Sequence, residues 1–228
     1  GDKFEIVFDL KKGILSGYSV KGEQFIAEGP KPSFWRAPTD NDIGAGFNVS
    51  QRKWRNAYDN ATDVQSIVSK NNDGSIQIKF STKLIDGEAS HQQTFTVYGD
   101  GSIKVNNEFT AIKGKNPLLM RAGNDLVINK NFNTINWYGR GPGENYWDRK
   151  TNTFIGQFKQ SVDEQYFPYA RPQESGNKTE TRWVSFSNAK GQKISFMFAD
   201  SLLSFSALPY NINDLDPEAQ KKQYHSGE

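Results

Sequence analysis

Alternation of apolar and polar residues with a period of two is the feature that most constrains the fold of this chain. The stretches 76–81, 94–97 and 194–198 each place isoleucine, valine or phenylalanine at every second position, with mostly polar residues between them. Successive side chains of a β-strand point to opposite faces, so this pattern predicts strands that turn one face toward a core. The dominant structure is therefore expected to be β.

Turn sequences separate these strands. Asn71-Asn72-Asp73-Gly74, Gly99-Asp100-Gly101 and Asn188-Ala189-Lys190-Gly191 lie between alternating runs, and Asp-Gly in such a place is a strong hairpin signal. The predicted antiparallel pairs are 63–70 with 75–82, 90–98 with 102–110, and 180–187 with 192–199. Together they predict an all-β fold, a large antiparallel β-sandwich that occupies residues 1–228 as a single domain.

Helix is expected to be scarce. Residues 50–57 are predicted to form one or two helical turns with Ser50 as the N-cap, because a serine side chain can accept a hydrogen bond from the first free N–H groups. Residues 211–221 are predicted to form a second short segment, whose start is limited by Pro217.

Composition excludes several classes of function. The chain has 228 residues, enough for a sizeable core, and its 28 basic and 26 acidic residues are interspersed, for a net charge of only +2. A nucleic-acid-binding protein would need a basic stripe, and a membrane span would need a long apolar run; neither is visible. The sequence contains no cysteine, which removes disulfides and thiolate chemistry. No signal peptide is expected, since the chain moves directly into strand-like alternation after Gly1-Asp2-Lys3.

The segment Phe34–Asp42 (FWRAPTDND) is the most distinctive polar stretch. Pro38 restricts Ala37 to extended conformations, and Thr39–Asp42 are residue types that hydrogen-bond to their own backbone in turns. The segment is therefore predicted to be an irregular polar loop with aromatic walls, a surface that suits a sugar or a partner protein.

Carboxylates in these loops are candidates for glycosidase chemistry, which needs two acids about 5 Å apart for retention or about 6.5–9.5 Å apart for inversion. The candidates are Asp40, Asp42, Glu144, Asp148 and Glu174. Sequence cannot place two of them at such a separation, and the simpler interpretation is that Asp40 and Asp42 cap turns while Glu144 ties down the glycine-rich loop before it. Residues 40–44 lack the ligand spacing of a calcium loop, and Gly139–Gly143 lacks a phosphate-loop lysine. No metal or cofactor is expected in this chain.

Several of these motifs, in this order, resemble the C-terminal small-chain domain of glycoside hydrolase family 2 β-galactosidases. They are residues 34–44 (FWRAPTDNDIG), 137–149 (WYGRGPGENYWDR) and 171–176 (RPQESG). The resemblance implies a sandwich like that of galactose mutarotases. It also implies an enzyme that hydrolyses terminal β-D-galactosides through a covalent intermediate, with both catalytic glutamates in an upstream (β/α)₈ barrel.

The expected role of this chain is then non-catalytic: to brace the barrel, help to wall the mouth of its active site and take part in oligomer contacts. The Mg²⁺ and Na⁺ ions that such enzymes often use would be bound elsewhere, and a bacterial cytoplasm or periplasm is the expected setting.

In one respect the sequence departs from this family. In the family, a Met-Gly-Val/Ile-Gly-Gly…Ser-Trp motif, whose tryptophan helps to line the galactose subsite, lies beyond the position of Glu228. This sequence stops before that motif, so the sandwich is expected to lack its last strands. The alternative is a free-standing carbohydrate-binding module or an aldose mutarotase. Mutarotases use a histidine acid and a glutamate base, whereas His91 and His225 are the only histidines here and both lie outside the polar loops.

The candidate carbohydrate-binding or inter-domain residues share a polar or aromatic side chain in a predicted loop. They are Trp35, Arg36, Asp40, Asn41, Asp42, Arg140, Glu144, Asn145, Arg171 and Glu174. Three interpretations stay open: the loops bind one another, for instance with Arg36 and Arg140 bridging Asp42 and Glu144; they dock against the barrel; or they contact sugar directly.

Overall fold

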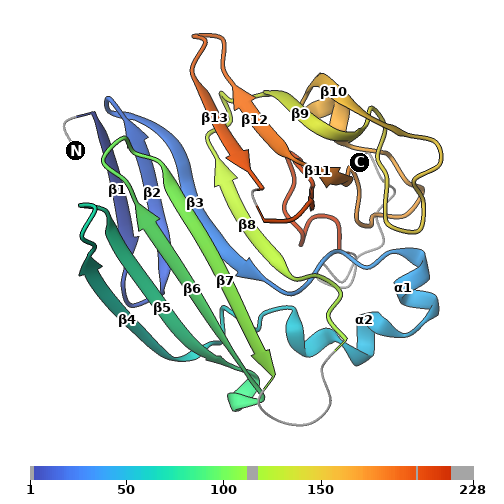
Figure 1. Ribbon diagram of the computed structural model, residues 1–228. Helices are drawn as coiled ribbons and strands as arrows, with labels where there is room; N and C mark the ends of the chain where they lie inside the picture. The colour runs from blue at the N-terminus through green and yellow to red at the C-terminus, as the bar shows by residue number, and fades with distance from the viewer. Residues whose placement is uncertain (1–2, 112–117, 199, 217–228) are drawn as a thin grey trace. The chain divides into compact units, whose positions relative to one another are not determined.

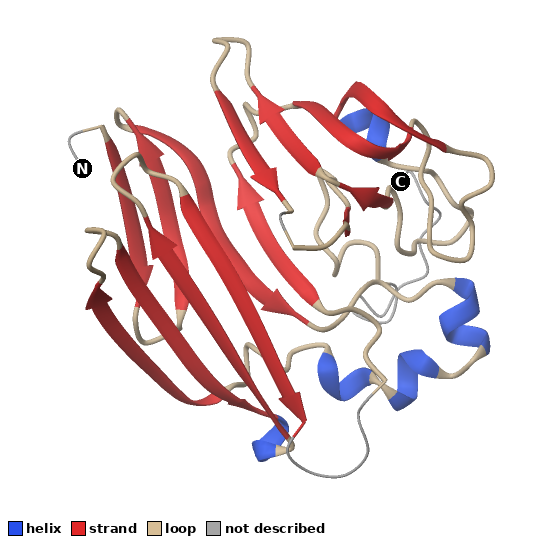
Figure 2. Cartoon of the chain, in the orientation of Figure 1, coloured by secondary structure: helices blue, strands red, loops and turns tan. Residues whose placement is uncertain are grey.

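The computed structural model describes residues 3–111, 118–198 and 200–216. The chain separates into two compact units, one of residues 1–35 and 47–129 and the other of residues 36–46 and 130–228. The predicted single domain stays a prediction. Antiparallel strands dominate both units and helices are short (Figure 2), which confirms the all-β fold class. Among the described residues no helix is long and apolar enough to cross a bilayer.

The first unit contains two four-stranded antiparallel sheets (Figure 1). One has the order β1 (Phe4–Asp9), β2 (Ile14–Val20), β3 (Glu23–Ser33) and β8 (Gly123–Ile128), and the other has the order β4 (Thr62–Lys70), β5 (Ile76–Leu84), β6 (Ala89–Val97) and β7 (Ile103–Ala111). The sheets pack face to face through aromatic rings. Phe8 of β1 lies 6.3 Å from Phe80 of β5 and 5.1 Å from Phe95 of β6, between ring centroids. This packing makes the unit a sandwich.

The two hairpins predicted for this unit are confirmed. Lys70 pairs with Ile76 at the end of β4 and β5, and Val97 pairs with Ile103 at the end of β6 and β7. In both turns the glycine that follows the aspartate has a positive φ, as an Asp-Gly turn requires. Ile78, Phe80 and Phe95 are all buried, so the alternation identified the core face correctly.

The helix predicted at 50–57 is wrong in its boundaries and its cap. Ser50 ends α2 (Phe47–Ser50) instead of capping a helix, and a 3₁₀ turn, η1 (Arg52–Trp54), follows without a side-chain cap. Burial decides the path of this segment: Trp54 packs at 6.0 Å from Phe34 and 5.7 Å from Phe109, between ring centroids. A further 3₁₀ turn, η2 (Ile85–Gly87), joins β5 to β6.

The second unit is built on a four-stranded antiparallel sheet of order β10 (Phe154–Ser161), β9 (Thr134–Gly141), β12 (Trp183–Ser187) and β13 (Lys193–Met197). A two-stranded sheet, β11 (Lys178–Thr181) with β14 (Leu203–Phe205), and the short helices α1 (Asp40–Gly44) and η3 (Asp163–Gln165) complete it. Trp137 forms its centre: the indole is fully buried and lies 5.2 Å from the ring of Phe158 and 6.0 Å from that of Phe205.

The third predicted hairpin is confirmed in its pairing, because β12 pairs with β13, but the predicted strand 180–187 is divided. Glu180 has a positive φ, and the pairing of β11 with β14 shifts its register between Lys178 and Thr181, so a regular strand does not continue through this position. The chain therefore leaves β11 at Thr181 and enters β12 at Trp183. Residues 211–216, where a second helical segment was predicted to begin, form a turn held by Asn211 and Asp214. The remainder of that prediction, 217–221, lies outside the described residues.

Candidate functional site

The predicted irregular loop contains a helix. Thr39 is the N-cap of α1, and its hydroxyl accepts a hydrogen bond of 3.2 Å from the N–H of Asp42. The Asp42 carboxylate in turn accepts one of 2.9 Å from the N–H of Thr39, which completes a capping box. The expectation of no regular structure at 39–42 is therefore wrong, because Thr-x-x-Asp satisfies the free N–H groups of a helix start.

Arg36 braces this helix start. Its guanidinium nitrogen Nη2 lies 2.9 Å from Oδ1 of Asp42, whose side chain is buried. The Arg36–Asp42 bridge is one of the internal contacts that the sequence predicted, and the structure confirms it. Asp42 thus receives hydrogen bonds on both oxygens.

The aromatic residues before this helix do not form the walls of an open loop. Phe34 and Trp35 are both buried, and Phe34 packs in the core of the first unit, 5.7 Å from the ring of His91. The predicted aromatic walls are therefore wrong: these side chains anchor the segment instead of offering a stacking surface. Asn41, in contrast, is exposed on α1.

The start of α1 is also tied to the loop that contains Arg171. The N–H of Asp40 donates to Gln173 Oε1 at 3.3 Å, and Gln173 Nε2 donates to Asp40 Oδ2 at 3.1 Å. Arg171 Nη1 lies 3.9 Å from Asp40 Oδ1, at the limit of an ion pair. Asp40 therefore holds two segments together that are 133 residues apart along the chain.

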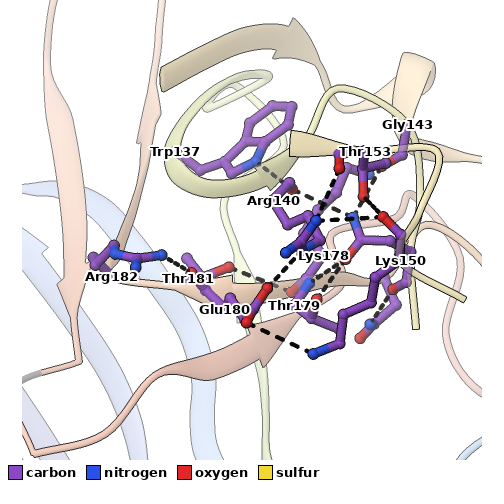
Figure 3. Close-up of polar contacts among 12 residues, drawn as sticks. Trp137, Arg140, Gly143, Lys150, Thr153, Lys178, Thr179, Glu180, Thr181 and Arg182 are labelled. Carbon is purple, nitrogen blue, oxygen red and sulfur yellow. Dashed lines mark hydrogen bonds and ion pairs between the residues drawn. The ribbon is translucent and has the colours of Figure 1, made fainter. Parts of the chain in front are cut away.

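Arg140 pairs with Glu180, not with Glu144 as predicted. From β9, its Nε lies 2.5 Å from Oε2 of Glu180 in β11, and its Nη1 donates to the carbonyl oxygen of Thr153 at 2.8 Å (Figure 3). Lys150 Nζ lies 3.6 Å from the other oxygen of Glu180. The hydrogen bond from Arg140 is the main cause that lowers the pKa of Glu180. The prediction failed because β11 packs against β9 and brings Glu180 to Arg140, a proximity that the sequence does not contain.

Glu144 joins two loops. One of its oxygens accepts a hydrogen bond of 2.8 Å from the N–H of Gly176, and the other accepts one of 2.7 Å from Arg149 Nη2 and one from the hydroxyl of Tyr169. The expected tie to the glycine-rich loop is thus replaced by a tie to residues 169–176. Burial first, and then the hydrogen bond to Glu144, raise the pKa of Tyr169.

Asn145 fastens the same loop to β11. Its side chain is 0% exposed, and its Oδ1 accepts from the N–H of Thr179 at 2.9 Å and from the hydroxyl of Thr179 at 2.6 Å. Its backbone N–H donates to the carbonyl of Asn177 at 2.8 Å. Nδ2 donates to the carbonyl of Gly143 at 3.1 Å. A buried carboxamide with all of these partners is a structural connection.

Glu174 is buried and accepts a hydrogen bond of 3.2 Å from the hydroxyl of Ser206. Asp42, Glu144 and Glu174, the three carboxylates predicted for the site that are largely buried, are thus all engaged in bonds within the unit. Among the described residues no three histidine, cysteine, aspartate or glutamate side chains come together where they could hold a metal ion.

Lys178 is a residue that sequence reasoning missed. The side chain is only 1% exposed, and its Nζ donates to the carbonyl of Gly176 at 3.1 Å and lies 5.5 Å from the centroid of the Trp137 ring. Burial lowers its pKa to about 8, against the opposing effect of the Glu144 charge. A lysine in a Lys-Thr-Glu-Thr stretch carries no sequence signal of burial.

Trp147 is the most exposed aromatic ring in these loops, with 65% of its surface accessible. Lys150 Nζ lies 3.8 Å from the centroid of its ring, close enough for a cation–π contact. The neighbouring guanidinium of Arg149 lies over the ring of Tyr146 at 4.9 Å. This loop therefore presents one aromatic surface beside a set of charges.

Comparison with known proteins identifies the family of this chain. The family model described as "Beta galactosidase small chain" matches residues 1–227. The chain belongs to this family. The resemblance that the sequence motifs indicated is thereby confirmed.

Full-length relatives are longer than this small chain. A β-galactosidase of Priestia megaterium is 35% identical over 216 residues, which are 95% of this chain and 21% of the relative. Those of Lactobacillus delbrueckii subsp. bulgaricus and Halalkalibacterium halodurans are 32% and 30% identical over 95% of this chain, or 21% and 22% of the relative. The small chain therefore spans about a fifth of the length of the relatives it matches.

Proposed function

We propose that this small chain is the non-catalytic C-terminal domain of a β-galactosidase, an enzyme that hydrolyses terminal β-D-galactosides. Two observations support the proposal. The chain matches only 21% of the Priestia megaterium β-galactosidase, so most of that enzyme has no counterpart here. The carboxylates of Asp42, Glu144 and Glu174 in the candidate site all accept hydrogen bonds from their own unit. A glycosidase, in contrast, needs an acid and a nucleophile directed at one glycosidic bond.

The single observation that carries the non-catalytic role is that both carboxylate oxygens of Glu144 accept hydrogen bonds. Arg149, Tyr169 and the N–H of Gly176 all donate to its two oxygens. Both oxygens are therefore occupied by donors of the same unit, whereas a glycosidase carboxylate must be directed at the glycosidic bond of its substrate. We assign Glu144 to the architecture of the loops.

The test is direct. The purified 228-residue chain is expected not to hydrolyse a chromogenic β-galactoside, while a β-galactosidase that contains it as one part is expected to do so. Activity of the isolated chain that survives purification, and that is lost in both Glu144→Gln and Glu174→Gln, would overturn the proposal. Activity that neither change affects would identify a contaminating enzyme.

Within such an enzyme we propose that the braced loops support the catalytic barrel and help to wall its active-site mouth. This proposal is supported by two features of the loops: hydrogen bonds that join them to one another, and exposed aromatic side chains. The loops are fixed to one another by hydrogen bonds of Asp40, Asn145 and Glu144. The side chain of Trp147 is 65% exposed, and that of Phe167 is 51% exposed. In the full-length enzyme, Trp147→Ala is expected to lower the melting temperature or raise KM, whereas the melting temperature of the isolated chain is expected to stay unchanged.

Direct sugar binding is a second candidate that one observation favours. The exposed ring of Trp147 lies in the loop that also carries the Glu144–Arg149 ion pair, and sugars bind by stacking on aromatic rings beside charged hydrogen-bonding groups. Titration of the chain with galactose, followed by tryptophan fluorescence, tests it. A saturable change that disappears in Trp147→Ala and persists in Phe154→Ala would support sugar binding over a purely supporting role.

A mutarotase role is disfavoured by the surroundings of His91. Its side chain is buried on β6, with ring centroids 5.7 Å from Phe34 and 6.1 Å from Tyr58, and burial lowers its pKa to about 4. A neutral imidazole inside an aromatic core cannot serve as a general acid for a sugar. His225 lies outside the described residues.

We further propose that any Mg²⁺ or Na⁺ used by the enzyme is bound by other parts of the polypeptide, and that the enzyme works in a bacterial cytoplasm or periplasm. The first rests on the ion pairs of the described loops, in which Asp42, Glu180 and Glu144 are paired with Arg36, Arg140 and Arg149. Dialysis of the isolated chain against a chelator is therefore expected to leave its melting temperature unchanged.

A further inference from the structure

The edge strand β4 is the most unprotected element of the first unit. It occupies the end of the sheet β4–β5–β6–β7 and pairs only with β5 in the described part of the chain (Figure 1). Apart from Val64, all of its residues are exposed. The two aliphatic side chains Ile67 and Val68 are 62% and 57% exposed, on opposite faces of the strand.

The central residues of this edge lack the charges and the proline that often block pairing. Residues 64–69, Val-Gln-Ser-Ile-Val-Ser, contain no charge, no proline and no glycine. Proteins commonly protect a sheet edge with lysines, proline, bulges or a covering segment. Here a register shift occurs only near the start, between Thr62 and Gln65, and the regular part runs from Gln65 to Lys70.

The backbone groups that face the open edge follow from the hairpin. Asn71 N–H donates to the carbonyl of Ser75 at 2.9 Å, and in an antiparallel pair the residues that bond to the partner strand alternate with those that do not. Residues 69, 67 and 65 therefore bond to β5, whereas Ser66, Val68 and Lys70 direct their N–H and C=O groups away from the sheet.

We propose that β4 is a self-association surface, at which two copies of this chain pair antiparallel with Ile67 on the two-fold axis. In this register Ser66 lies opposite Val68 of the partner copy, so outward N–H and C=O groups of both strands meet and bond. Ile67 lies opposite its own copy in a non-hydrogen-bonded position, where side chains approach most closely.

A second copy fits this edge because the edge is complementary to itself in three respects. The two sets of outward backbone groups coincide in the antiparallel register. The exposed Ile67 side chain, on a face whose nearest cross-strand neighbour is Lys79, obtains an apolar partner. Within the regular part of the strand, Gln65 lies opposite Ser69 of the partner copy, so no charges are opposed. The two four-stranded sheets would become one continuous sheet, with closed point-group symmetry.

The absence of cysteine makes the register directly testable. Ile67→Cys is expected to form a covalent dimer under mild oxidation, since Cβ atoms in a non-hydrogen-bonded pair are about 4.5–5.5 Å apart, near the range for a disulfide. The matched control is Val49→Cys in α2, an exposed aliphatic position away from the edge. It is expected to stay monomeric on a non-reducing gel at the same protein concentration.

Sedimentation equilibrium of the unmodified chain tests association itself. We expect a reversible monomer–dimer equilibrium at micromolar to submillimolar concentration, weakened at least tenfold by Ile67→Lys and unchanged by Val49→Lys. Circular dichroism would show that both variants fold, and the Cys variant keeps the test valid if Ile67→Lys does not. A monomer at all concentrations, a dimer insensitive to Ile67→Lys, or equal cross-linking at positions 67 and 49 would overturn the proposal.

Discussion

Asn145 and Thr179 are joined by a double hydrogen bond: one carboxamide oxygen accepts from both the N–H and the hydroxyl of the threonine, at 2.9 and 2.6 Å. Both residues are fully buried. This contact fixes the loop after β9 to β11, and it makes the geometry of the polar loops depend on one side chain that water does not reach.

Asn145→Ala is expected to destabilise the chain by about 2–4 kcal/mol, because it leaves both donors of Thr179 buried without an acceptor. Urea denaturation measures the loss. Asn106→Ala, at an exposed position in β7, serves as the matched control and is expected to change stability by less than about 0.5 kcal/mol. Equal effects of the two substitutions would contradict the structural role of Asn145.

Arg36→Ala is expected to destabilise the isolated chain by about 1–2 kcal/mol, as for a hydrogen bond to a charged group whose arginine is still partly exposed to solvent. The double variant with Asp42→Ala is expected to show coupling, since the two side chains bond directly. Thermal or urea denaturation of the two single variants and the double variant measures it. Strictly additive losses would show that the ion pair contributes no stability.

The buried Lys178 is expected to make the free energy of unfolding increase as the pH rises above 8. Its folded pKa of about 8 lies below the ordinary value of 10.5, so between these values the unfolded chain binds a proton that the folded chain does not. The free energy of unfolding should therefore increase as pH rises from 8 toward 10.5, by on the order of 2–3 kcal/mol in total.

Lys178→Met tests this dependence, because it removes the charge and keeps much of the volume. The variant is expected to have a free energy of unfolding that changes less between pH 8 and 9.5 than that of the parent chain. Measurements should stop below pH 10, because burial also raises the pKa of Tyr58, to about 12, and stability lost through tyrosine begins above pH 10. Parallel curves for the two proteins would show that Lys178 is not the source.

The buried His91 is expected to lower the free energy of unfolding as the pH falls below 6.5. Its folded pKa of about 4 lies below the ordinary 6.5 because of burial, so the stability contributed by the neutral ring is present above pH 6.5 and is lost as pH falls toward 4. The difference between the parent and His91→Gln should shrink over this range by on the order of 2–3 kcal/mol. Urea denaturation at pH 7.0, 5.5 and 4.5 provides the measurement, and a constant difference would contradict it.

Much of the local structure could be predicted from sequence, because it depends on residues close together along the chain. The hairpins β4–β5 and β6–β7 follow from period-two alternation with Asp-Gly between the strands. The Arg36–Asp42 bridge spans only six residues. Even the missed helix α1 had a readable signal, since Thr39-Asp40-Asn41-Asp42 is a capping-box pattern, but the neighbouring Pro38 favoured a turn in our interpretation.

The partners of Arg140, Glu144 and Lys178 could not be predicted, because strand packing brings them together over long chain separations. Arg140 meets Glu180 across 40 residues, and Glu144 meets Gly176 across 32. Sequence determined that this chain is a β protein of the small-chain family whose loops carry these polar groups. Only the tertiary structure decided which groups pair and which are buried, since a hydrogen bond requires a separation near 3 Å and the position of one strand against another sets that separation.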